Sequence, residues 1–269
     1  MQLDPISSVS EYIQRVLDYR RAWFPAEPCE EIWYRGVKDN SHQLLPGAYW
    51  RSECDETSLS LTFRAAVPGL LPHQPADDWE WYYLMQHYGL PTRLLDWTEN
   101  PLAALYFALD RADDKTTPAV WVLDPVALNK LSGDAVVFTP TDSGGQRPID
   151  KWLTDSCFRN ATPFTFNLPS NVKLRDNRLP LAIFPKRHNP RIIAQRGTFT
   201  VHGVEETPIN RLAVKRLDGG DGCARIDIAP YAIGRMREEL WGVGITKTLI
   251  YPEPQSLAED LKRIYGVAP

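Results

Sequence analysis

Four polar segments that interrupt apolar sequence hold the side chains best suited to chemistry. The first is Tyr34-Arg35-Gly36, at the end of an apolar run. A guanidinium presents a rigid fork of donors that can hold a phosphate or a carboxylate by two hydrogen bonds. The motif therefore indicates an anion-binding arginine, although an ion pair between Arg35 and a buried aspartate explains it equally well.

The second segment, residues 86–98, holds a histidine, an arginine, an aspartate and two threonines between two predicted helices. Loops between rigid flanks often carry function. A lone histidine such as His87 is nevertheless more often a structural or surface residue than a functional one. Asp96 is expected to pair with Arg35 or with Arg93.

The last two segments each allow a functional and a structural interpretation. Residues 98–101 begin a helix, whose free N–H groups could bind an anion, but Asn100 could simply cap that helix. In residues 191–200, the sequence Gln195-Arg196-Gly197 separates two strand-like runs. This break could direct Gln195 into a cleft, or it could be an ordinary hairpin turn.

The sequence lacks the motifs of several common enzyme classes and of metal sites. The sequence contains no GxGxxG, P-loop, HExxH or GxSxG motif. The five histidines do not stand at ligand spacing, and the four cysteines form no CxxC pair. We therefore expect neither a metal site nor a disulfide framework.

Composition indicates a globular protein that does not enter a membrane. The 269 residues are 43% hydrophobic and 24% charged, and the net charge of −4 gives no footprint for sequence-independent DNA binding. No apolar stretch approaches the ~18 residues of a membrane span, and the N-terminal residues do not resemble a signal peptide. A cytoplasmic location is the expectation.

Hydrophobic periodicity and capping residues indicate alternating helices and strands. Trp81, Leu84, Met85 and Tyr88 fall at helical spacing, so Trp81 and Leu84 are expected in the core. The predicted helices cover residues 8–20, 56–66, 78–88, 231–241 and 256–265, with another starting after Asn100. The predicted strands cover residues 31–37, 92–97, 118–124, 181–184, 191–195, 197–203 and 246–251.

No change in composition marks a domain boundary, so one α+β domain is the simplest organisation. We place this domain at residues 11–265. Residues 132–180 are polar, rich in proline and difficult to assign, and we expect an insertion or irregular segment there.

These segments together resemble the FRG domain family, named for a Phe-Arg-Gly type motif that stands here as Tyr34-Arg35-Gly36. The stretch QHYGLPTRLLDWTENPLAALYFAL, residues 86–109, is the most specific part of the resemblance. Residues 194–203 and 244–261 also fit. The resemblance extends over roughly residues 11–265.

More remotely, the chain resembles the ADP-ribosyltransferase fold. This resemblance implies a split, twisted, antiparallel or mixed β core flanked by helices. Arg35 would stand on the first core strand, and Thr98 near a Ser/Thr position that precedes a helix. The third element of that fold usually opens with a glutamate. Here Gln195 is the only plausible polar substitute, and it cannot offset developing positive charge.

The resemblance implies that NAD lies in the cleft as a substrate. Stacking on nicotinamide would come from Tyr34, Trp97 or Tyr106, and a general base from His87 or Asp96. The implied catalytic residues are Arg35, His87, Asp96 and Gln195. The implied nucleotide contacts are Tyr34, Arg35, Gly36, Arg93, Trp97, Thr98 and Asn100.

The sequence thus favours an NAD-dependent ADP-ribosyltransferase or NAD glycohydrolase, of a kind that acts as a toxin or phage-defence effector. One alternative is a non-catalytic module that binds a nucleotide or nucleic acid on the same fold, because aromatic rings and arginine suit base stacking. Another is a hydrolase that uses His87, Asp96 and Arg93. The expected partner is a nucleotide, while the acceptor and any protein partner stay open.

Overall fold

The computed structural model describes residues 4–25, 31–50, 56–71, 73–132, 137, 139–140, 179–187, 189–203 and 205–267. Almost all of the predicted insertion at 132–180 lies outside these residues. So do Cys29, Cys54 and Cys157, and Cys223 is a free thiol. Within the described part of the chain, no helix is both long and apolar enough to cross a bilayer.

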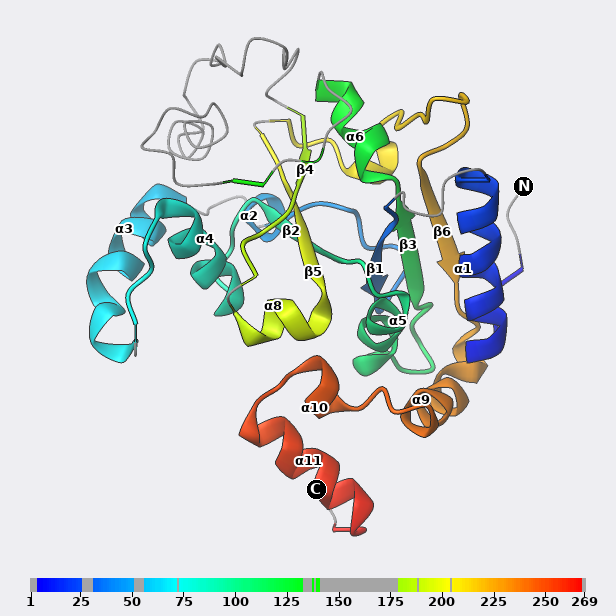
Figure 1. Ribbon diagram of the computed structural model, residues 1–269. Coiled ribbons are helices and arrows are strands. Elements are labelled where there is room, and N and C mark those ends of the chain that lie inside the picture. The colour runs from blue at the N-terminus through cyan, green and yellow to red at the C-terminus, as the bar shows by residue number, and fades with distance from the viewer. Residues whose placement is uncertain are drawn as a thin grey trace.

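Among the described residues, the β core is a six-stranded sheet whose strand pairs are all antiparallel, and a single parallel bridge joins Ile6 to Ile228 beside β6. The α+β class is confirmed. The strand order is β4-β5-β2-β1-β3-β6 (Figure 1). The strands are β1 (Trp33–Val37), β2 (Leu94–Thr98), β3 (Ala119–Leu123), β4 (Leu181–Ile183), β5 (Gly197–Val201) and β6 (Cys223–Asp227).

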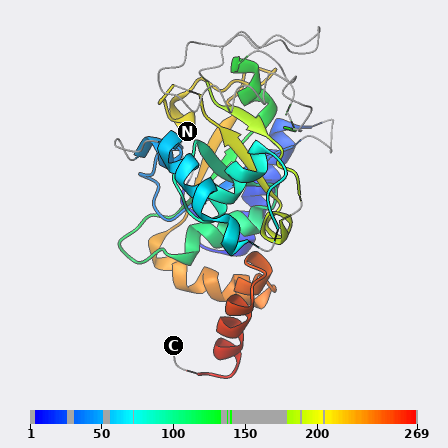
Figure 2. The same cartoon turned by 90° about the vertical axis from the view of Figure 1, so that its left-hand side faces the viewer.

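Helices flank this sheet, and the last helices of the chain extend beyond it (Figure 1). Figures 1 and 2 show α11 projecting away from the rest of the chain. The helices are α1 (Val9–Trp23), α2 (Gly47–Trp50), α3 (Glu56–Ala66), α4 (Asp78–His87), α5 (Pro101–Asp110), α6 (Pro125–Ser132), α8 (Pro190–Gln195), α9 (Ile233–Gly242), α10 (Lys247–Ile250) and α11 (Pro254–Ile264). The predicted helices at 8–20, 56–66, 78–88, 231–241 and 256–265 are confirmed within a few residues, while α2, α6 and β6 were not predicted.

The sheet is nearly divided at its centre. β1 and β2 pair only at Tyr34 with Thr98, whereas every other neighbouring pair of strands aligns three to five residues. Beyond that single pair, the two strands no longer share a ladder, and their facing backbone groups need other partners. The sheet is therefore continuous, with one weak joint at its centre.

Two groups of helices cover the same face of the two halves. On β2, Leu94 lies on the face of Thr98 and packs against α4. On β1, the paired Tyr34 packs into a core with α1, α5 and α9. Figure 1 shows α3 and α4 beside one half of the sheet and α1 and α9 beside the other. The opposite face carries a separate core, which includes Trp33 and Leu128 of α6.

Gly36 allows α5 to approach β1 closely. A Cβ atom at this position would lie 1.9 Å from the main-chain oxygen of Ala104 and 2.5 Å from the nitrogen of Ala108. Both neighbouring atoms belong to backbone, so they cannot turn away as a flexible side chain would. The glycine of the Tyr-Arg-Gly motif is thus explained by helix packing.

Two predicted strands are helices in the structure. Residues 191–195 belong to α8, where Asn189 accepts a hydrogen bond from Arg191 N and Pro190 occupies the first helical position. Residues 246–251 overlap α10, which Thr246 caps through Leu249 N. β-Branched residues suggested strands in both places, but local capping and tertiary contacts outweigh that weak preference.

The predicted core face of α4 is also wrong. Trp81 and Leu84 are only partly buried, and Tyr88 is 58% exposed. The side chains that pack inward are Trp79, Tyr82, Tyr83 and Met85. Aromatic and apolar residues surround this helix almost completely, so periodicity alone could not identify the buried face.

Candidate active site

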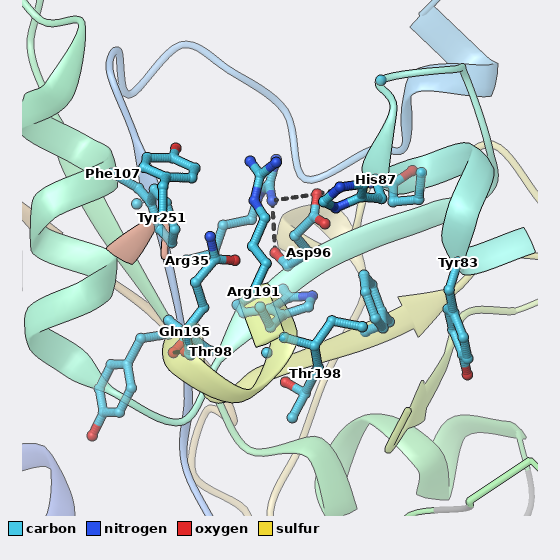
Figure 3. A pocket seen from close by; sticks show the side chains of 18 residues that line it. Arg35, Tyr83, His87, Asp96, Thr98, Phe107, Arg191, Gln195, Thr198 and Tyr251 are labelled. Carbon is cyan, nitrogen blue, oxygen red and sulfur yellow. Dashed lines mark hydrogen bonds and ion pairs between the residues drawn. The ribbon is translucent and has the colours of Figure 1, made fainter. Parts of the chain in front are cut away.

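A cavity of about 380 Å³ lies on the helix-covered face, at the joint between the two halves of the sheet. Residues of β1, β2 and β5 line it together with α4, Phe107 of α5, and α8. Tyr251, directly after α10, completes the lining. Its volume falls near the lower end of the ~300–1,000 Å³ typical of ligand pockets. The cavity thus joins segments from the N-terminal, middle and C-terminal parts of the chain (Figure 3).

Arg35 bridges the opening between β1 and β2. Its Nη1 donates to the main-chain oxygen of Asp96 at 2.6 Å and lies 3.8 Å from Oδ2 of the same residue. Burial lowers the pKa of the Arg35 guanidinium, while Asp96 opposes that effect. Arg35 Nε is buried and has no hydrogen-bond partner in the described part of the chain. The expected pairing of Asp96 with Arg35 is confirmed.

Asp96 is the one carboxylate among the described residues that line the cavity. Its side chain is 57% exposed, and Gln86 Nε2 donates to Oδ2 at 2.9 Å. The hydroxyl of Thr92 donates to the other end of the Gln86 amide. This chain of contacts fixes the carboxylate. Gln86 was not singled out from the sequence, because only the fold shows that it reaches Asp96.

His87, at the end of α4, also lines the cavity. Burial, followed by the positive charge of Arg191, lowers the pKa of its imidazole, and Glu253 opposes these effects. The neutral form is therefore favoured near neutral pH, and a neutral imidazole can accept a proton. Figure 3 shows His87 beside Asp96 at the same wall.

Arg191 and Tyr251 form a wall that sequence reasoning missed. The Arg191 guanidinium carbon lies 4.5 Å from the centroid of the Tyr251 ring. The Tyr251 ring meets Phe107 edge-on at 6.1 Å. Arg191 stood within a singled-out segment, but its role could be recognised only after the fold brought α8 to Tyr251.

Gln195 and Thr98 tie the cavity wall together. The Thr98 hydroxyl donates to the main-chain oxygen of Gln195 at 2.5 Å and accepts from Asn100 N at 2.9 Å. Gln195 Nε2 donates to the main-chain oxygen of Ile250 at 3.1 Å. Both residues line the cavity as expected. The hydroxyl of Thr98, however, is used in contacts within the protein.

Of the aromatic residues expected to stack on a ligand, Tyr34 and Trp97 line the cavity, but both side chains are buried. Tyr34 is 2% exposed, and burial raises the pKa of its hydroxyl to about 12. The Trp97 indole is buried on the opposite face and donates to Thr200 Oγ1 at 3.1 Å. Tyr106 lines a different cavity. The lining also contains Tyr83, Phe107, Phe199 and Tyr251.

Arg93 and Asn100 do not line the cavity. Arg93 is 3% exposed, and its Nε donates to Glu56 at 2.9 Å in a buried ion pair. Asn100 caps α5 by accepting from Leu102 N at 3.0 Å and from Ala103 N at 3.4 Å. The structural interpretation of Asn100 is confirmed, and Arg93 anchors α3 to the start of β2.

No cluster of three or more histidine, cysteine, aspartate or glutamate side chains suited to a metal ion occurs among the described residues. Arg35, His87, Asp96, Thr98 and Gln195 share a lining of mixed charge and aromatic character. Such a lining can bind an anionic ligand and accept a proton from it.

Comparison with known proteins finds one similarity. Residues 30–117 match the family model described as FRG domain. This matched range contains the Tyr-Arg-Gly motif and the whole of residues 86–109. This match supports the FRG family for that part of the chain, while residues 194–203 and 244–261 lie beyond it. No curated protein and no solved structure matches the chain.

Proposed function

We propose that the cavity binds NAD and that the protein cleaves the bond between nicotinamide and ribose. It would act as an ADP-ribosyltransferase if a further molecule accepts the ADP-ribose, or as an NAD glycohydrolase if water does. The observation that carries the proposal is the convergence of Arg35, Asp96 and Gln195, from three separate segments, on one cavity at the joint in the sheet. A toxin or phage-defence role would follow from depletion or transfer of such a common metabolite.

The size of the cavity suits one half of the dinucleotide. A volume near 380 Å³ would enclose a mononucleotide, with the adenosine half extending toward solvent. Phe107 and Tyr251 offer aromatic surface to the nicotinamide ring. Arg35, which lines the cavity and donates to the main chain of Asp96, would contact the nicotinamide ribose.

Asp96 takes the part of the missing glutamate in this proposal. When the bond between C1′ and the nicotinamide nitrogen breaks, its electron pair leaves with nicotinamide, and C1′ becomes an oxocarbenium-like centre. The fixed carboxylate of Asp96 would stabilise that positive charge. The oxygen of water or of an acceptor hydroxyl then bonds to C1′, and its proton passes to the neutral imidazole of His87.

The test is release of nicotinamide from NAD, measured by chromatography. We expect activity in the wild type and a loss of about 10²–10³ in kcat for Asp96→Asn, as for other electrostatic groups that act on a transition state. Glu238→Gln, on an exposed face of α9 outside the cavity, is the matched control and should keep full activity. Absence of nicotinamide release by the wild type would contradict the proposal.

The second candidate is a nucleotide-binding module without catalysis. It is favoured by Gln195, since an amide stands where the fold that the chain resembles has a glutamate, and Gln195 Nε2 is already bound to Ile250. Saturable NAD binding in calorimetry without any nicotinamide release would support this candidate over the enzyme.

A further inference from the structure

We propose that Arg191 is the residue that binds the anionic group of the ligand, and that Arg35 instead holds the sheet joint in place. This inference rests on nucleotide binding in the cavity but not on cleavage. The ligand has a planar ring joined to a phosphate, and the phosphate binds on the α8 side of the cavity.

The charges of the two arginines are compensated differently. The Arg35 guanidinium donates to the main chain of Asp96 and lies near its carboxylate, so much of its charge and one donor are already satisfied. Arg191 makes no ion pair within the part of the chain that the structure describes. Asp96 is the only carboxylate in the lining there, and it lies near Arg35, so Arg191 leaves the cavity with an excess of one positive charge.

The position of Arg191 suits a donor to phosphate. Its guanidinium lies over the Tyr251 ring and also hydrogen-bonds that side chain, which orients the planar group. A guanidinium carries five N–H donors, so donors remain for a phosphate. Two side-chain contacts hold this wall: Gln195 binds the main chain of Ile250, and Tyr251 meets Phe107. An arginine fixed in this way loses little freedom when a ligand binds.

The neighbouring cations do not compete for this role. Arg187 and Arg196 both pair with Glu99, and neither lines the cavity. His87 carries a depressed pKa and is mostly neutral near pH 7. A phosphate that enters the cavity at neutral pH thus meets one uncompensated cation, Arg191.

The experiment measures how much a phosphate adds to affinity. Calorimetry on the full chain would compare adenosine with AMP, and nicotinamide riboside with nicotinamide mononucleotide. In the wild type, we expect the phosphorylated member of at least one pair to bind about tenfold or more tightly than the unphosphorylated member, as for a charge-assisted contact. Arg191→Gln should reduce that ratio to about twofold or less, and Arg191→Lys should restore part of it.

Arg196→Gln is the matched control, because it removes one positive charge from the same segment outside the cavity. It should leave the phosphate ratio unchanged. An unchanged ratio in Arg191→Gln would overturn the assignment while leaving nucleotide binding intact. If Arg196→Gln lowered the phosphate ratio as much as Arg191→Gln does, the assignment to Arg191 would be overturned, because the overall positive charge of the segment would explain the ratio. If neither ligand pair bound the wild type, this inference would be overturned. If the phosphate ratio depended on Arg191 but the wild type released no nicotinamide from NAD, only the proposed cleavage would be overturned.

Discussion

The guanidinium of Arg35 donates to the main-chain oxygen of Asp96, 2.6 Å away, across the opening between β1 and β2. The bond replaces part of the ladder that these strands lack beyond Tyr34 and Thr98. An arginine side chain therefore takes the place of a backbone donor, and the same residue lines the cavity. This arrangement couples the stability of the sheet joint to the geometry of the site.

This coupling predicts that Arg35 variants lose stability whereas Asp96 side-chain variants do not. Arg35→Met should lower the free energy of unfolding by about 1.5–3 kcal/mol, because it removes a charge-assisted hydrogen bond. Asp96→Asn keeps the main-chain acceptor and loses only a half-exposed ion pair, so it should cost less than about 1 kcal/mol. Urea denaturation measures both, and equal losses would contradict the prediction.

Gly36→Ala should destabilise the protein by about 1–3 kcal/mol or more, because the added methyl group overlaps backbone atoms of α5. Gly234→Ala, in α9, is the matched control. A Cβ at Gly234 meets nothing within 4 Å, so the substitution should be neutral or slightly stabilising. In thermal denaturation, the melting temperature of Gly36→Ala should fall, while that of Gly234→Ala should stay the same or rise slightly. An unchanged melting temperature for Gly36→Ala would contradict the prediction and would mean that α5 can move away from β1.

Glu56 and Arg93 form a buried ion pair whose side chains are 10% and 4% exposed. Glu56→Gln should cost about 3–5 kcal/mol, because it removes the carboxylate from a buried ion pair. The exposed pair of Arg64 with Asp78 also joins α3 to α4, so Asp78→Asn serves as the control and should cost about 0–1 kcal/mol. Chemical denaturation would distinguish the two variants.

Trp79 and Trp81 test which face of α4 is buried. Trp79 is 2% exposed, whereas Trp81 is only partly buried, under Arg64. Trp79→Ala should cost about 3–5 kcal/mol through the cavity it creates, and Trp81→Ala distinctly less. Reversal of this order in urea denaturation would mean that the helix packs by the face that periodicity first indicated.

His202 should make the protein sensitive to mild acid. Burial, followed by the charges of Arg93 and Arg35, lowers the pKa of His202 from 6.5 to about 3. The unfolded chain therefore binds a proton that the folded chain excludes, and stability falls as the pH drops from 6.5 toward 3. At pH 5 the loss relative to pH 7 is about 2 kcal/mol.

Denaturation at a series of pH values checks this prediction. His202→Gln should remove that part of the pH dependence, and His73→Gln, at an exposed position, is the control. An identical acid slope in the His202→Gln variant would assign the effect to other groups.

The local structure of the chain could be predicted where one residue dictates it. Ser8 begins α1, Asn100 and Pro101 begin α5, and Gly89 follows α4 with a φ of 76°, all as expected. Caps and left-handed positions depend on neighbours within a few residues, so the sequence contains their whole cause. The apolar strands at the centre of the sheet were also predicted, because β-branched and aromatic residues favour strands, but their pairing depends on distant segments.

The sequence by itself determined the class of the fold, most of its elements and the segments that carry polar residues. Only the tertiary structure decided that residues 191–195 form a helix, that Arg93 and Trp97 are structural, and that Arg191 reaches Tyr251. The physical reason is that these outcomes depend on contacts between residues far apart in the chain. A periodic pattern shows that a face is apolar, but not which distant surface it will meet.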